Sequence, residues 1–113
     1  MSESGQTWQR AFKALPVEAV GVRAWTSTRT PHPDAPQIAN ELFVALLHSG
    51  ADTIEMTIST AGDRTRITAS GHLLLRTRHS HGPGRRIITG LAQSTGLTVD
   101  ECGLWAQIQE PGL

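Results

Sequence analysis

The chain has 113 residues, which suffices for one compact domain. Its formal net charge is zero, which argues against a protein held to nucleic acid by a basic surface. Its single cysteine excludes an internal disulfide and favours a reducing compartment. No apolar targeting run opens the chain and no stretch reaches the ~18 apolar residues of a membrane helix, so we expect a cytoplasmic protein without membrane contact.

The first third of the chain predicts a tail, a strand, a helix and a loop. Residues 1–7 are small and polar, which predicts a disordered tail. Residues 8–15 predict a strand, and Pro16 suits the first turn of a helix over residues 16–29. The prolines Pro31, Pro33 and Pro36 then predict a loop.

Residues 37–50 carry the strongest helical pattern. Apolar residues recur along two adjoining stripes, Ile38, Leu42 and Leu46, and Ala39, Phe43 and Leu47. They predict a buried helix, with Asp34 as its N-cap and Gly50 as its C-terminal stop. One acid, Glu41, lies inside this run. An acid on a buried helix is costly unless it is hydrogen-bonded or works at a site.

The rest of the chain predicts an antiparallel sheet. Residues 53–59 and 64–69 alternate between apolar and polar around a turn at 60–63. A polar connection over 71–86 follows, then a third helix from Ile87 that stops at Gly96, and a closing hairpin of residues 97–100 and 104–109. We therefore predict an α+β fold, a two-layer sandwich of a mixed, largely antiparallel sheet covered on one face by about three helices. It forms one domain over residues 8–109, with 110–113 as a C-terminal tail.

Several stretches together resemble a known family. They are the acid-bearing helix 41–50, the hairpin 54–71, the loop-to-helix junction Gly82-Pro-Gly-Arg-Arg and the terminal strand 103–108. In this order, over residues 10–109, the chain resembles the GHKL superfamily of ATPase domains (the Bergerat fold). Within it, the chain is most similar to the anti-sigma-factor serine kinases and related ATPase-like regulators.

The resemblance implies roles for particular positions. Glu41 matches the acid that serves the family as base for phosphoryl transfer. The Asn that holds Mg²⁺ one helical turn later is replaced by Ala45, which has no ligand atom. The Asp that accepts the adenine amino group falls on Ser70 or Gly71, and the adenine-side Thr falls on Gly103. The metal ligand and both adenine-side groups are therefore expected to be lost.

The glycine loop is the part of the site that survives. Gly82 and Gly84 lead into a helix whose free N–H groups favour anions, and Arg85 and Arg86 add positive charge. Pro83 removes one N–H that could cradle phosphate. This segment has two interpretations, a phosphate-binding loop and a solvated loop without a ligand, and the sequence favours neither. The pair His79 and His81 lacks the further ligands of a zinc site, so we predict no bound metal there.

Two interpretations of Glu41 follow. It is a retained catalytic base, or a helix acid partnered by Arg or a backbone N–H after activity was lost. Ala45 favours the second, because Asn40, about 100° round the helix from Glu41, cannot simply replace the missing metal ligand.

The leading hypothesis is thus a cytosolic regulatory protein with a degenerate ATPase-like domain, which binds a sigma factor, an anti-anti-sigma factor or a transcription regulator. Nucleotide binding is weakened or lost, so the cofactor is none, or ATP or ADP with Mg²⁺ if the pocket still works. The alternatives are an active ATP-dependent protein serine kinase that uses Glu41 as base, a protein that binds nucleotide without turnover, and a plain interaction domain. The resemblance also allows a homodimer, and we expect no direct contact with nucleic acid.

Overall fold

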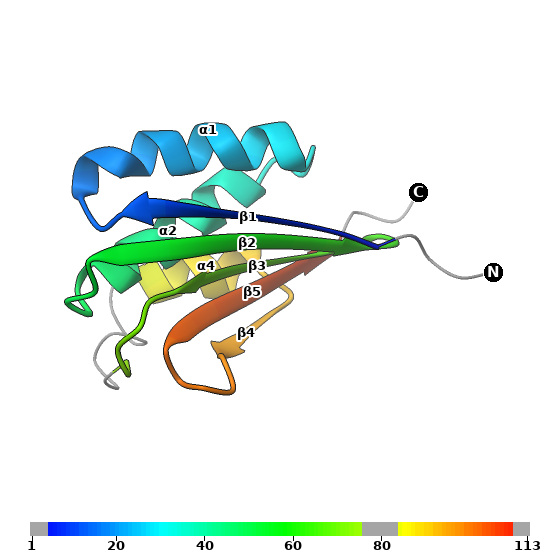
Figure 1. Cartoon of the computed structure of the whole chain (residues 1–113). Coiled ribbons are helices and arrows are strands. Elements are labelled where there is room, and N and C mark those ends of the chain that lie inside the picture. The colour runs from blue at the N-terminus through cyan, green and yellow to red at the C-terminus, as the bar shows by residue number, and fades with distance from the viewer. Residues whose placement is uncertain (1–4, 76–83, 110–113) are drawn as a thin grey trace.

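The computed structural model describes residues 5–75 and 84–109, with the backbone alone at 84–86 and 89. A five-stranded sheet forms one layer, and the helices α1 (Ala19–Arg29), α2 (Ala35–Leu47) and α4 (Gly84–Leu91) lie on one of its faces (Figure 1). The α+β fold class and the predicted order of elements are confirmed. Every strand pairing among the described residues is antiparallel, so this part of the sheet is not mixed.

The strands are β1 (Gly5–Lys13), β2 (Thr53–Ala61), β3 (Arg64–Ser70), β4 (Ser94–Leu97) and β5 (Gly103–Gln109). Their order across the sheet is β1-β2-β3-β5-β4, which leaves β1 and β4 at the edges. The predicted hairpin of β2 and β3 is confirmed, and Gly62 in its tight turn has a φ of 62°.

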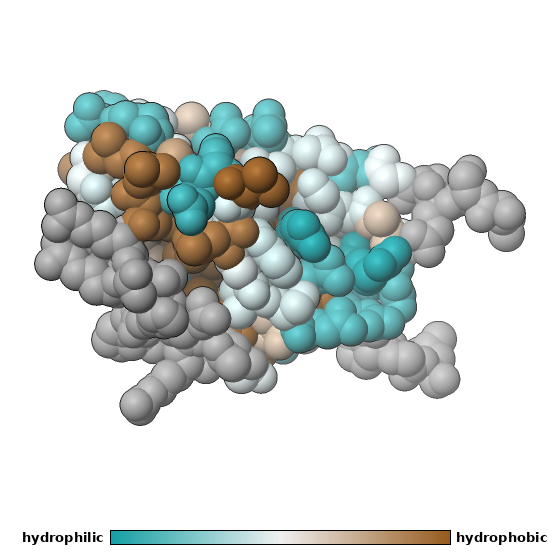
Figure 2. Space-filling model, turned by 90° about the horizontal axis from the view of Figure 1, so that it is seen from below, coloured by the Kyte–Doolittle hydropathy of each residue, from teal (hydrophilic) through white to brown (hydrophobic). Residues whose placement is uncertain are grey.

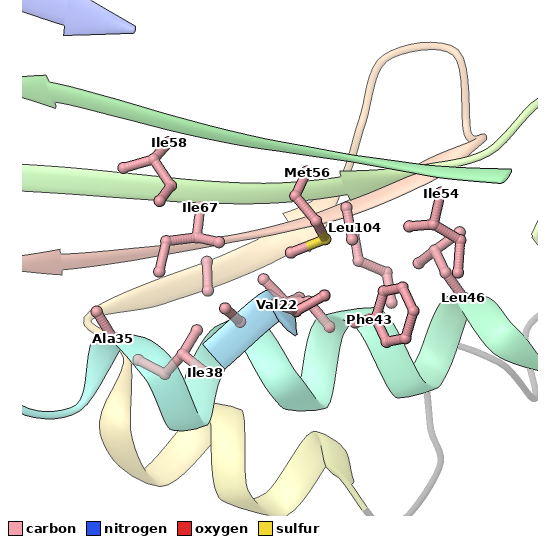
Figure 3. Packing of buried hydrophobic residues seen from close by; sticks show 14 of the residues in the cluster. Val22, Ala35, Ile38, Phe43, Leu46, Ile54, Met56, Ile58, Ile67 and Leu104 are labelled. Atoms are coloured by element: carbon pink, nitrogen blue, oxygen red, sulfur yellow. The ribbon is translucent and has the colours of Figure 1, made fainter. Parts of the chain in front are cut away.

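The core lies between the sheet and α2. Side chains from β2, β3 and β5 point toward α2 (Figure 3), and the fully buried ones include Ile54, Met56, Ile58 and Ile67 of the sheet and Ile38, Phe43 and Leu46 of α2. Phe12 of β1 meets Trp25 of α1 and Phe43 edge-on, with ring centroids 6.0 and 6.2 Å apart. This burial is the main stabilising contribution, at about 25 cal/mol for each Å² of apolar surface.

The first strand begins three residues earlier than predicted, at Gly5 rather than Trp8. The whole of β1 pairs with β2, from Gly5 opposite Ala61 to Lys13 opposite Thr53, so the hydrogen-bonded ladder draws in residues that composition alone assigned to a tail. A short 3₁₀ turn, η1 (Pro16–Glu18), then leads into α1.

The third helix ends at Leu91, and its predicted extension to Gly96 was wrong. Gly96 belongs to β4 and lies against Trp105 of β5, where a Cβ would come within 3.1 Å of the indole. The turn after β4 is held by Asp100, whose carboxylate accepts hydrogen bonds from the Thr98 hydroxyl (2.6 Å) and the Cys102 N–H (3.0 Å). The strand predicted over 97–100 lies three residues earlier, at Ser94–Leu97, because residues 98–100 belong to this turn.

Candidate functional site

Glu41 lies on the flank of α2, not on its buried side. The carboxylate is half-buried and accepts hydrogen bonds from the side-chain amides of Gln37 (2.8 Å) and Asn40 (3.4 Å). Asn40 in turn accepts a hydrogen bond from Arg23 of α1 at 2.5 Å. The predicted buried helix is confirmed; its buried positions are all apolar, and Glu41 lies beside them at a half-buried position. Glu41 thus accepts hydrogen bonds from two side-chain amides, and Arg23 is linked to it only through Asn40. This network was not predicted, although Gln37 precedes Glu41 by one helical turn, a spacing that favours the first of these contacts.

Ala45 follows Glu41 by one helical turn and packs its methyl group against the core. It offers no atom that could bind a metal. Asn40 is turned toward α1 by its bond to Arg23, so its carbonyl oxygen does not serve in place of Ala45. Within the described part of the chain, no group of three or more His, Cys, Asp or Glu side chains gathers into a metal site.

Ser70 and Gly71, at the end of β3, face opposite sides of the sheet. Ile67 and Ala69 are buried under the helices, so the alternation of the strand directs Ser70 to the open face. Gly71 donates its N–H to the carbonyl of Cys102 (2.9 Å), and a Cβ on it would lie 2.8 Å from the Cβ of Ala51. The structure therefore does not bring Ser70 together with Glu41, and position 71 has no free space for a side chain.

Ser70 instead lines a depression of about 350 Å³ on the open face of the sheet, together with Thr68, Thr98, Val99 and Asp100. The pKa of Asp100 is lowered, chiefly by the hydrogen bond from the Thr98 hydroxyl and then by the one from the Cys102 N–H. Asp100, the carboxylate among these lining residues, thus stabilises the turn to which it belongs. The residue type and spacing of an Asx turn, Asp100 followed two residues later by an N–H donor, could have revealed it.

Gly103, where the family carries an adenine-side Thr, opens β5 directly opposite Ser70. A Cβ at this position would lie 2.7 Å from the carbonyl oxygen of Ala69 and 2.8 Å from the Cβ of Ser70. Both neighbours belong to the paired strand β3, so they cannot rotate away. The contact leaves no room for a hydroxyl-bearing side chain here.

Gly84 begins α4, and Ile88 of the same helix is buried in the core. Gly82 lies outside the described residues, as do the side chains of Arg85 and Arg86. His79 and His81 lie outside them too. Anion binding at this loop-to-helix junction therefore stays a prediction.

A larger hollow of about 580 Å³ lies at the other end of the sheet, lined by Asp63, Arg64, Gln93, Ser94, Gln107 and Gln109. Its side chains bond to one another. Gln93 donates to Gln109 (2.9 Å), and Gln109 donates to Asp63 (2.8 Å). The hollow is polar and open, and it contains neither Glu41 nor Ala45.

No protein-family model matches this chain, and no curated protein matches it either. None of the helices in the described ranges is long and apolar enough to cross a membrane. The likeness to the GHKL superfamily therefore rests on the order and spacing of motifs in the sequence.

Proposed function

We propose that this chain is a cytosolic regulatory protein that keeps an ATPase-like architecture and acts by binding a protein partner, with nucleotide binding weakened or lost. The surroundings of Glu41 carry the proposal. Its carboxylate is held by Gln37 and Asn40, and the next position on the same flank of the helix, Ala45, has no metal ligand. Phosphoryl transfer depends on a bound metal and on positioned groups, so a lone carboxylate does not support it.

The positions expected to bind adenine support the same conclusion. Ser70 faces the open side of the sheet, away from the helix layer on which Glu41 lies. Gly71 and Gly103 are each in close contact with neighbouring atoms, at 2.8 and 2.7 Å from a Cβ built on them. A nucleotide would therefore find neither an acceptor for its adenine amino group nor a ligand for its Mg²⁺ among these residues.

Exposed apolar side chains suit a protein that works by contact. The segments 71–75 and 98–102 run side by side, joined by hydrogen bonds from Gly71 to Cys102 and from Leu75 to Glu101, both 2.9 Å. They carry Leu74, which is 67% exposed, and Val99, which is wholly exposed. Figure 2 shows hydrophobic side chains gathered at one end of the visible face. Exposed apolar patches of this kind mark protein contacts.

The partner would be a sigma factor, an anti-anti-sigma factor or a transcription regulator, in keeping with the family that the sequence resembles. The mechanism would be occupancy: docking covers the partner's working surface, and release restores it. This mechanism needs a fitting surface and a stable fold, and it needs no chemical step at Glu41.

Thermal unfolding with and without ATP, ADP and Mg²⁺ tests the loss of nucleotide binding. A ligand at about 100 times its dissociation constant would stabilise the fold by about 2.7 kcal/mol, a shift of about 10 °C for a domain of this size. We expect no shift with any nucleotide. A shift of this size with any of the nucleotides would overturn the proposal. Transfer of the γ-phosphate of ATP to a bound partner would establish the kinase alternative.

Affinity capture from cell extract tests the contact itself. We expect wild-type protein to retain a specific partner and Val99→Asp to lose it. Val20→Asp is the matched control, because Val20 is also an exposed valine (63%) but lies on α1. Equal retention by both variants would contradict a contact through residues 98–102.

A further inference from the structure

A depression interrupts the open face of the sheet, and Gly103 is the reason for it. Its lining residues are Thr68, Ser70, Thr98, Val99 and Asp100. Ser70 is paired with Gly103 across β3 and β5, and the Thr98 N–H donates to the Gly103 carbonyl (2.9 Å). Position 103 has no side chain, and β3 leaves no room for one, so a gap of about 350 Å³ opens between Ser70 and Thr98. None of the described helices covers it, because all of them lie on the other face (Figure 1).

The polar atoms that line the depression are hydrogen-bond acceptors. Both bonds that hold the closing turn end on Oδ1 of Asp100, one from the Thr98 hydroxyl (2.6 Å) and one from the Cys102 N–H (3.0 Å). The same two bonds lower the pKa of Asp100, so its carboxylate is ionised at neutral pH. Among the described residues, neither Oδ2 of Asp100 nor the hydroxyl groups of Thr68 and Ser70 form a hydrogen bond. Three oxygen atoms can therefore accept hydrogen bonds from a ligand.

Val99 adds an apolar wall to these acceptors. It lines the depression and is wholly exposed, so its methyl groups can contact the aliphatic stem of a ligand. A second carboxylate lies beyond Ser70: Glu55 of β2 is exposed and stands directly opposite Ser70 in the register. Side chains opposed in this way have Cβ atoms about 5 Å apart. Apolar surface beside two negative charges fits a cation that is carried on an aliphatic stem.

Arg66 is the next side chain along this face of β3, and it does not line the depression. Its guanidinium lies 4.2 Å from the centroid of the Trp105 ring and donates a hydrogen bond to the side-chain carbonyl of Gln107 (3.1 Å). Both contacts hold Arg66 against β5, so this cation is not the partner of the Asp100 carboxylate.

We propose that this depression binds an arginine side chain of the protein partner. The guanidinium donates hydrogen bonds to Oδ2 of Asp100 and to the hydroxyl oxygens of Thr68 and Ser70. The aliphatic part of the arginine packs against Val99. Arginine is favoured over lysine because its planar group carries five N–H donors in a fixed fork, whereas the lysine ammonium is a strongly hydrated point charge. That the arginine belongs to a protein rests on the proposed function, in which the partner contacts residues 98–102.

A small probe tests the site without the partner. N-acetyl-arginine methylamide carries the guanidinium and its stem, and N-acetyl-citrulline methylamide is a neutral compound of nearly the same shape. We expect the arginine compound at millimolar concentration to shift the backbone amide signals of Ser70 and Cys102 saturably in proton–nitrogen NMR spectra. The citrulline compound should leave both signals unchanged. Equal shifts with the two compounds, or no saturable shift with the arginine compound, would overturn the inference.

Two variants assign the binding to named groups. Asp100→Asn removes the charge but keeps an oxygen in the place of Oδ1, so the closing turn can still form. Thr68→Val removes one acceptor and keeps the shape of the side chain. We expect each to weaken binding of the arginine compound about tenfold or more, because hydrogen bonds to charged groups are the strong ones. The matched control is Asp63→Asn, which neutralises an exposed acid in the turn between β2 and β3 and should bind as wild type does. Wild-type affinity in Asp100→Asn or in Thr68→Val would contradict the site.

The same variants separate this inference from the proposed function. A partner captured by wild-type protein should bind Asp100→Asn and Thr68→Val about tenfold or more weakly than Asp63→Asn. Equal affinity for all three variants would overturn the arginine contact and leave the binding of a partner intact. Wild-type protein that shows the arginine-dependent shifts but retains no partner would contradict the proposed function and not the site.

Discussion

Replacing Gly103 by alanine should destabilise the fold by about 1–3 kcal/mol, the usual cost of an added methyl group in a filled space. The new Cβ would stand 2.7 Å from the carbonyl oxygen of Ala69 and 2.8 Å from the Cβ of Ser70. Both atoms belong to β3, which pairs with β5 along its whole length. Relief therefore requires the strands themselves to move apart, since no flexible side-chain end can give way.

The same substitution at Gly90 is the matched control. Among the described residues, a Cβ there meets nothing within 4 Å, and the residue lies in α4. Alanine is favoured over glycine in a helix, so Gly90→Ala should stabilise the fold by up to about 1 kcal/mol. One chemical change is thus expected to have opposite signs at the two positions.

Urea unfolding followed by far-ultraviolet circular dichroism measures both effects. With a slope of about 2 kcal/mol per molar urea, a loss of about 2 kcal/mol lowers the midpoint by about 1 M. A Gly103→Ala midpoint equal to or above that of the wild type would refute the reasoning. The close approach of β3 and β5 would then not explain why position 103 carries no side chain.

Three further changes probe the core, the Arg23 contact and the closing turn. Leu46→Ala should cost about 2–5 kcal/mol, because Leu46 is fully buried, whereas Leu74→Ala should stay within about 0.5 kcal/mol of wild type; equal urea midpoints would contradict this. Arg23→Ala removes a part-buried bond to Asn40 and should cost about 1–3 kcal/mol by thermal unfolding, and an unchanged transition would argue against that bond. The lowered pKa of Asp100 means that its carboxylate stabilises the fold above the pKa of the unfolded chain and loses this effect as the pH falls through the folded value. The urea midpoint of wild type should therefore exceed that of Asp100→Asn at neutral pH and match it in acid; a difference that persists in acid would count against this role.

Much of the fold follows from residue patterns. The alternation of Ile54, Met56 and Ile58 fixes which face of β2 is buried, and the two apolar stripes of α2 fix its contact with the sheet. The helix ends at Leu47, earlier than the stop predicted at Gly50, and Gly50 belongs to the turn that follows, where its φ of 87° is a conformation that glycine adopts without strain. These features depend on neighbours close in sequence or on simple periodicity.

The errors arise where distant residues decide. Gly96 looked like the end of a helix, but its contact with Trp105 places it in β4. Gly5 looked like part of a tail, but pairing with Ala61 places it in β1. The orientation of Glu41 depends on the side-chain amides of Gln37 and Asn40 and on Arg23 from another helix. Sequence spacing could suggest the contact with Gln37, but not the position of Arg23.

Titration calorimetry with Mg²⁺-ATP tests the central proposal most directly. The position one helical turn after Glu41 is Ala45, which has no atom that binds a metal. Gly103 leaves no room for an adenine-side hydroxyl. We therefore predict no saturable heat when Mg²⁺-ATP is added to the folded protein. Saturable binding of one nucleotide per chain would contradict the proposal and restore an ATP-dependent function.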